Sequence, residues 1–214
     1  MFKKDMYEVI LFHDMLMVKC ENVWIKDFFD LQSLKTWAIE NDISFYRFPL
    51  KELLAKETGT LASIVEIWMY KASKGGLFSH LISWQEKLEK HDKNKGKYSH
   101  VEINFPTLEL CWSSSEVDGG TRYKFIKKDY EKWDFFAVET TDILQIASEI
   151  ERITPSPYDW LAIAQFLCNW VQDHPNRFVC NEGVHHVMMV DGTWVPLSYI
   201  PAPGDIYDVF LVPC

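Results

Sequence analysis

Four strands are predicted in a row between residues 98 and 138, and this run constrains the fold more than any other part of the chain. The first two, at residues 101–105 and 108–113, are separated by only two residues, which is the spacing of a β-hairpin. An Asp-Gly-Gly turn then leads to two further strands at 123–126 and 135–138. Because strands joined by such short connections pair in antiparallel fashion, we expect a largely antiparallel sheet.

Helices are predicted after these strands. Residues 141–153 carry apolar side chains three and four positions apart, as one face of a helix does. Ser156 and Pro157 offer an N-cap and a first helical residue to a segment that stays apolar nearly all round as far as residue 171, so this helix is expected to be central. A further helix is predicted to begin near Cys180.

The predicted fold class is α/β of the α+β kind, with a mixed, mostly antiparallel sheet packed on the helix that bears Cys180. This domain is expected to span residues 61–214. Residues 1–60 are predicted to form a small α/β appendage with no recognisable chemical motif. The predicted elements of the appendage are two strands within residues 7–20, a helix within 27–42, a strand at 44–49 and a helix at 50–56. The main domain also contains a predicted strand at 63–70, a helix at 79–88 and a last strand at 209–212.

Composition and charge exclude several classes of function. The chain has 214 residues, 48% of them hydrophobic, which is enough for a sizeable core. It carries 22 Lys and Arg against 31 Asp and Glu, and the net charge of -9 opposes binding to nucleic acid or anionic lipid. No run approaches the roughly 18 apolar residues of a membrane span, and no secretion signal is visible, so we expect a cytoplasmic protein.

Five cysteines are scattered along the chain, and one of them is well placed to be a nucleophile. Their odd number and the absence of any CxxC pair favour neither a disulfide framework nor a zinc ribbon. Cys180 begins a predicted helix, where unpaired backbone N–H groups and the helix dipole favour a thiolate. A cysteine at a helix start is more often structural than catalytic, so a catalytic role for Cys180 depends on a histidine that can act as its base.

The expected partner is His100, in the segment 98–103, which reads as a strand. A thiolate nucleophile needs an imidazole that accepts its proton and returns it. Glu102 has the same parity along the strand as His100, so both side chains lie on one face, and Glu102 can orient the imidazole or contact substrate. The adjacent His185 and His186 point to different sides of a helix and are not expected to share a metal ion. No metal and no cofactor are predicted.

Two segments of the chain resemble the opening of a known enzyme family. Gly-Gly-Leu-Phe-Ser-His-Leu-Ile-Ser-Trp at 75–84, followed by Tyr-Ser-His-Val-Glu-Ile at 98–103, is similar to the start of the circularly permuted papain-like thiol hydrolases of the YiiX type. These hydrolases are relatives of the NlpC-type cell-wall peptidases. In that family the histidine precedes the cysteine, as His100 precedes Cys180, which reverses the papain order.

Later segments continue the resemblance, which covers roughly residues 63–212. Phe-Val-Cys-Asn-Glu around Cys180 is similar to the family's nucleophile segment, and the Tyr-Asp-Trp that begins at Tyr158 is similar to its tyrosine-containing helix start. The family's acid lies on the strand after the histidine, so the resemblance implies Glu109 as the orienting acid, with Glu102 as the alternative. The chain departs from the pattern by lacking the family's opening Gly-Asp and by carrying Asn181 in place of serine.

The expected activity is that of a cysteine peptidase or amidase. Cys180 would attack a carbonyl to give a thioester, His100 would act as acid and base, Glu109 would orient the imidazole, and Tyr158 and Glu102 would contact the substrate. The resemblance implies peptide, cell-wall peptide or lipid-linked acyl substrates with an amide, isopeptide or ester bond. The alternative is a catalytically inactive papain-like protein that binds an apolar ligand or a protein partner. The sequence does not indicate the oligomeric state.

Overall fold

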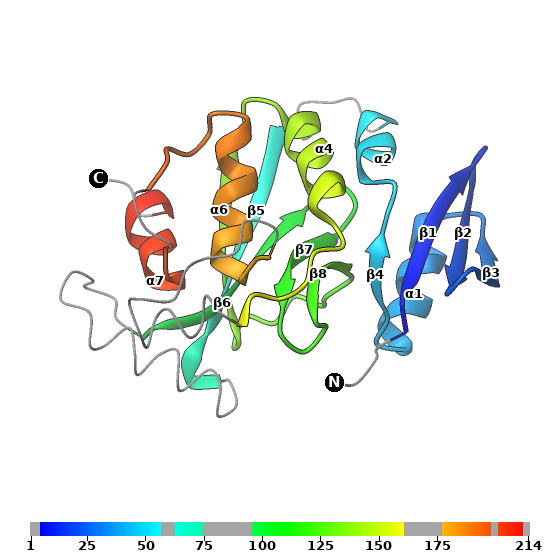
Figure 1. The fold of residues 1–214 in the computed structure, drawn as a ribbon, viewed down its shortest axis with the longest axis horizontal. Coiled ribbons are helices and arrows are strands. Elements are labelled where there is room, and N and C mark those ends of the chain that lie inside the picture. Colours follow the sequence, from blue (N-terminus) through cyan, green and yellow to red (C-terminus); the bar gives the residue numbers. More distant parts are fainter. Residues whose placement is uncertain (1–4, 57–62, 75–95, 161–176, 198–200, 212–214) are drawn as a thin grey trace.

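The computed structural model describes residues 5–56, 63–74, 96–160, 177–197 and 201–211 (Figure 1). Its described strands form a single nine-stranded sheet in the order β3-β2-β1-β4-β8-β7-β6-β5-β9. The strands are β1 (Tyr7–Phe12), β2 (Met15–Cys20), β3 (Val23–Phe28), β4 (Ser44–Arg47), β5 (Ile64–Lys71), β6 (Tyr98–Phe105), β7 (Leu110–Ser115), β8 (Gly120–Lys124) and β9 (Trp133–Glu139).

The sheet is mixed but mostly antiparallel, which confirms the predicted α+β class. Strands β1 and β4 pair in parallel, and the other neighbouring strands pair in antiparallel fashion. Strand β4 also pairs with β8, through Ser44 opposite Lys124 and Phe45 opposite Tyr123. The strands of the first 60 residues therefore continue the sheet that contains β6 and β7, without a break at the predicted domain boundary.

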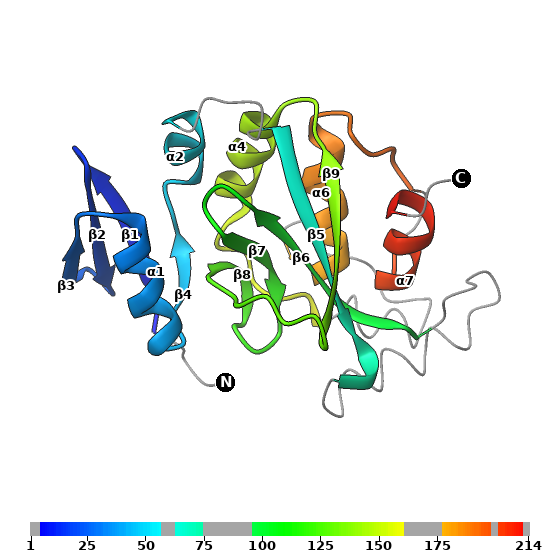
Figure 2. The same ribbon diagram turned by 180° about the vertical axis from the view of Figure 1, so that it is seen from behind.

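Helices cover both faces of this sheet. They are α1 (Leu31–Glu40), α2 (Leu50–Lys56), α4 (Ile143–Ile153), α6 (Cys180–Val190) and α7 (Pro203–Ile206), with a short 3₁₀ turn at Ala72–Lys74 and a π-helical turn at Tyr207–Leu211. Helix α6 packs on β6 and β7 and lies beside α4, which in turn contacts α2. Figures 1 and 2 together show α1 on the opposite face of the sheet from α4 and α6. No described helix is both long enough and apolar enough to cross a membrane.

Side-chain alternation along β6 separates the core from the polar residues of the strand. Val101 and Ile103 are fully buried in the same apolar cluster as Val184 and Val187 of α6. The positions between and beside them carry polar side chains, His100 and Glu102 among them, because successive residues of a strand point to opposite faces. One strand thus both anchors the sheet on α6 and presents a histidine and an acid side by side.

Several local predictions are confirmed. The two strands within residues 7–20 turn at His13, which has a φ of 55°. Helix α4 matches the predicted helix closely, and Asp142 caps it by accepting from the N–H groups of Leu144 and Gln145. Helix α6 begins at Cys180 as predicted.

Other local predictions are wrong, because tertiary pairing overrides the local signal. Strand β3 was not expected: it is an edge strand, exposed over most of its length, so it lacks the alternation that marks a half-buried strand. Pro157 does not begin a helix. Instead it bridges to Gly120, while Tyr158 bridges to Phe178. The predicted helix at 79–88, and the predicted central helix from residue 161 onward, lie outside the described residues.

The predicted last strand at 209–212 is wrong as far as it is described. Residues Tyr207–Leu211 form a helical turn that follows α7. Phe210 stacks on Trp194 with ring centroids 4.4 Å apart, and it also contacts His185 of α6. Aromatic packing against His185 of α6 and against Trp194 therefore outweighs the strand propensity of this apolar run.

Candidate active site

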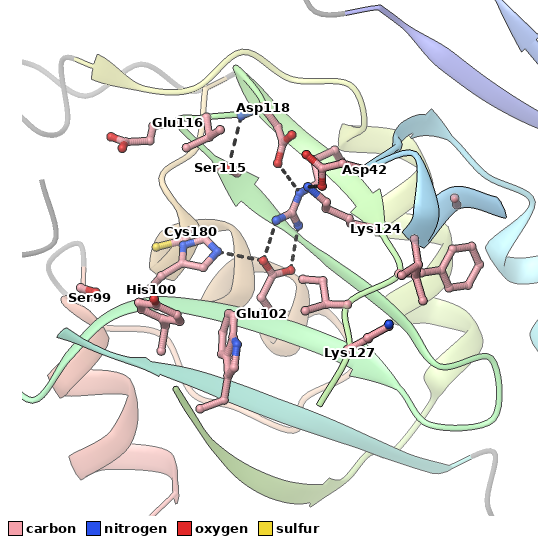
Figure 3. A pocket seen from close by; sticks show the side chains of 18 of the residues that line it. Asp42, Ser99, His100, Glu102, Ser115, Glu116, Asp118, Lys124, Lys127 and Cys180 are labelled. Atoms are coloured by element: carbon pink, nitrogen blue, oxygen red, sulfur yellow. Dashed lines mark hydrogen bonds and ion pairs between the residues drawn. The ribbon is translucent and has the colours of Figure 1, made fainter. Parts of the chain in front are cut away.

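Cys180, His100, Glu102 and Tyr158 line one cavity of about 520 Å³ (Figure 3). They come from α6, from β6 and from the segment between α4 and α6. The end of α1 contributes to the wall of the same cavity through Ala38 and Ile39. Residues far apart in the sequence, including part of the N-terminal segment, therefore meet around one thiol.

Cys180 is the first residue of α6, and the local sequence explains why the helix begins there. Val179 has extended backbone torsions, and its N–H donates to the Glu182 carboxylate at 3.3 Å, which closes the first turn. Helix geometry leaves the N–H groups of the first turn without intrahelical acceptors. The Cys180 side chain is buried, and its sulfur lies 3.4 Å from the side-chain oxygen of Asn181. The thiol thus lies in the positive field of a helix start.

His100 connects this thiol to an acid. Its Nε2 lies 2.9 Å from Oε1 of Glu102, and its side chain lines the same cavity as the Cys180 thiol. Figure 3 shows the Cys180 sulfur on the side of the imidazole away from Glu102. Burial lowers the pKa of His100, but the negative charges of Cys180 and Glu102 and their hydrogen bonds outweigh burial and raise it to about 10. The side chain stays 24% exposed, which leaves it accessible from the cavity.

Glu102 is held in place by an arginine. Its side chain is 1% exposed, and both of its oxygens accept from Arg122, Oε2 from Nη1 at 2.7 Å and Oε1 from Nη2 at 2.6 Å. Burial raises the pKa of Glu102, but Arg122 and His100 overcome that effect and hold it at about 2. The carboxylate is therefore ionised at neutral pH and is oriented by a bidentate pair on one side and by the imidazole on the other.

Glu109, implied as the orienting acid by the family resemblance, does not reach His100. It lies in the turn between β6 and β7, where its φ is 50° and its N–H donates to the carbonyl of Pro106. Its side chain is 60% exposed and pairs with Lys35 of α1. The strand predicted from residue 108 begins only at Leu110, so Glu109 belongs to the turn. The structure instead brings the alternative acid, Glu102, to the imidazole.

Tyr158 is brought to the thiol by two backbone bridges. Its N–H donates to the carbonyl of Gly119 at 3.0 Å, and it pairs in parallel with Phe178, two residues before Cys180. The ring is 5% exposed. The pKa of Tyr158 is raised well above its usual value, first by burial and then by the charge of Cys180, so the phenol stays protonated and can donate a hydrogen bond.

The two other histidines noted in the sequence diverge. His185 Nε2 lies 3.0 Å from the carbonyl oxygen of Val195, and His186 Nε2 lies 2.6 Å from a carboxylate oxygen of Glu149. Within the described ranges, no group of three or more His, Cys, Asp and Glu residues is arranged to hold a metal ion.

Sequence reasoning missed the residues that support Glu102. Arg122 and Asp118 are both buried, and Arg122 Nε donates to Asp118 Oδ2 at 3.0 Å. An arginine directly before the predicted strand at 123–126, with an aspartate four residues earlier, is only a weak signal for a buried ion pair. Nothing in the sequence indicated which carboxylate that ion pair would contain.

Comparison with known proteins adds no relative. No family model matches the chain, and neither the curated proteins nor the solved structures contain a significant match.

Proposed function

We propose that this protein is a cysteine hydrolase that cleaves an amide, isopeptide or ester bond. The observation that carries the proposal is the alignment of a helix-start thiol, an imidazole and a buried carboxylate in one cavity, in the order Cys180, His100, Glu102. This is the set of groups that thiol hydrolases require: a nucleophile, a base and a group that orients the base. A histidine that precedes the cysteine in the chain also supports the suggested relation to permuted papain-like enzymes.

The first half of the reaction forms a thioester. The Cys180 thiolate attacks the substrate carbonyl carbon, and the carbonyl oxygen takes up the negative charge of the tetrahedral intermediate. The N–H of Cys180, in the first turn of α6, is the expected donor to that oxyanion, and Tyr158 is available to hydrogen-bond the substrate nearby. The intermediate collapses when the bond to the leaving group breaks, and the His100 imidazolium gives its proton to the departing amine or alcohol.

The second half returns the enzyme to its starting state. His100, now neutral, accepts a proton from water, and the hydroxide so formed attacks the thioester carbonyl. The C–S bond breaks, the acid product leaves, and the thiolate–imidazolium pair forms again. Throughout both halves Glu102 keeps the imidazole in one orientation and stabilises its charged form, since it stays ionised beside Nε2.

The walls of the cavity favour an acyl group with an apolar portion. Ile39, Phe125, Ile126 and Trp133 line it, and Glu116 and Lys127 also belong to its lining. A volume of about 520 Å³ is within the usual range for small-molecule and peptide side-chain sites. Peptide, cell-wall peptide and acyl-lipid substrates all fit this description.

Site-selective alkylation tests the proposal before any substrate is known. At pH 6 to 7, iodoacetamide should modify Cys180 faster than Cys20, a partly exposed thiol on β2 that serves as an internal reference. The substitution His100→Ala should abolish that preference. Equal rates at the two cysteines, unaffected by His100→Ala, would refute the enzyme proposal and favour an inactive binding protein. A screen of acyl substrates against wild type and Cys180→Ser would then identify the bond that is cleaved.

A further inference from the structure

A continuous chain of buried polar contacts leads from strand β4 to the imidazole. Ser44 Oγ donates to Asp118 Oδ1 at 2.8 Å, and Tyr46 Oη donates to the backbone carbonyl of Asp118 at 2.6 Å. Asp118 Oδ2 accepts from Arg122 Nε, and the remaining two nitrogens of that guanidinium hold Glu102. Figure 3 labels Asp118, Glu102 and His100 and marks the contact between Glu102 and His100 with a dashed line.

The polar contacts that connect β4 to His100 are buried, which strengthens them. Ser44, Tyr46, Asp118 and Arg122 are all buried, so the contacts are shielded from solvent, which would otherwise weaken them. Two carboxylates share one guanidinium, which leaves a negative charge that a protonated imidazole neutralises. This series of contacts therefore favours the charged form of His100 as long as Glu102 keeps its position.

Asp118 determines the orientation of the arginine. A guanidinium presents its donors in a rigid planar fork, so fixing its Nε side also fixes the direction of the other two nitrogens. Both carboxylate oxygens of Asp118 are engaged, one by Ser44 and one by Arg122. Its backbone is held by Tyr46. Ser44 and Tyr46 have the same parity on β4, so the strand presents both donors on one face.

We propose that Ser44 and Tyr46 are positioning residues of the active site, which act on His100 through Asp118, Arg122 and Glu102. This inference rests on the proposed cysteine hydrolase. It gives a role to the first 60 residues, in which sequence motifs indicated none: β4 holds the far end of the polar chain, while Ala38 and Ile39 of α1 form part of the cavity wall. The N-terminal segment is then a component of the catalytic site.

The substitutions Tyr46→Phe and Ser44→Ala each remove one hydroxyl and leave the apolar packing in place. Each single variant should slow iodoacetamide modification of Cys180 at pH 6 to 7 by roughly 3- to 10-fold, as expected for the loss of one hydrogen bond in a coupled set. Ser44→Thr, which keeps the hydroxyl, should restore most of the rate. Tyr123→Phe is the matched control: it removes a buried hydroxyl from the neighbouring strand outside this chain of contacts, and it should leave the rate unchanged.

The pH dependence separates positioning from general loss of structure. Above the ordinary thiol pKa of about 8.5 a cysteine ionises without help from an imidazole, so the deficit of both variants should shrink between pH 9 and 10. A deficit of the same size at every pH would indicate altered access or folding and would overturn the inference. The inference would also be overturned if both variants were folded, as checked by thermal unfolding, and labelled Cys180 at the wild-type rate. If wild-type Cys180 itself shows no His100-dependent reactivity, the hydrolase proposal fails first.

Discussion

Replacing Glu102 by glutamine tests whether Glu102, which the structure places beside His100, or Glu109, which the family resemblance implied, orients the imidazole. The side chain keeps its shape, but it loses the charge that lies 2.9 Å from the imidazole and that Arg122 holds from the other side. Loss of the Glu102 charge leaves Cys180 as the main group that raises the pKa of His100. Because an ion pair with the imidazole supplies the thiolate at neutral pH in the proposed enzyme, Cys180 should become less reactive.

The size of the effect follows from the contact that is lost. A hydrogen bond to a charged group contributes about 1.5–3 kcal/mol. Since 1.36 kcal/mol corresponds to a factor of ten, the alkylation rate of Cys180 at pH 6.5 should fall roughly 10- to 160-fold. The same substitution leaves the buried Arg122 with Asp118 alone, and breaking one arm of a buried ion pair costs about 3–5 kcal/mol of folding stability.

Glu109→Gln is the matched control. Glu109 is an exposed carboxylate paired with Lys35 on the surface, so its loss should change folding stability by less than about 1 kcal/mol and leave the alkylation rate unchanged. The assay is the second-order rate of iodoacetamide labelling at Cys180, read by peptide mass spectrometry, with urea unfolding measured in parallel. If Glu109→Gln slowed labelling and Glu102→Gln did not, the assignment of Glu102 would be refuted.

Three further predictions concern stability and substrate contact. Gly120→Ala should destabilise the fold by more than about 3 kcal/mol in urea unfolding, because a Cβ there would lie 2.0 Å from the Ser156 carbonyl oxygen. The control Gly192→Ala, at a glycine with open space around it, should lower the free energy of unfolding by only about 1 kcal/mol. The pKa of His100 is raised from 6.5 to about 10. Its contribution to folding stability is therefore fully present below pH 6.5 and is lost as the pH rises towards 10. Over that pH range the urea unfolding midpoint of wild type should fall more steeply than that of His100→Gln. Tyr158→Phe should reduce kcat/KM on any substrate found by roughly 10-fold while leaving iodoacetamide labelling of Cys180 within about twofold, and equal losses in both assays would rule out a role in contacting substrate.

The elements of the fold that could be predicted are those with strong local signals. The Asp142 cap and the apolar spacing of α4 both lie within the helix that they specify. Strand β3 could not be predicted, because an exposed edge strand shows no alternation and is defined by its pairing with β2. The bridge from Pro157 to Gly120 likewise depends on a partner 37 positions away, while the local Ser-Pro pair favours a helix start.

The candidate site was predictable only in part, for a related reason. Cys180 and His100 each carry a local signal, one at a helix start and one on a strand, and both line the cavity. The choice between Glu102 and Glu109 depended on where the second strand of the hairpin begins, and element boundaries are the least certain part of a sequence prediction. Strand parity already placed Glu102 beside His100. The start of β7 at Leu110, two residues later than predicted, left Glu109 in the turn.

The supporting residues of the site show why its assembly depends on the whole sheet. A carboxylate as fully buried as Glu102 needs a cation, and Arg122 on β8 supplies it from two strands away, across β7. An arginine so buried needs a second anion, which Asp118 supplies, and Asp118 needs donors, which β4 supplies. These burial requirements bring β8 and then β4 into the site, with Asp118 in the turn between β7 and β8 as the link. The requirements end at β4, because Ser44 and Tyr46 are neutral donors and bring no further charge into the interior. This gives the N-terminal strands a physical reason to be hydrogen-bonded into the same sheet as the candidate catalytic histidine.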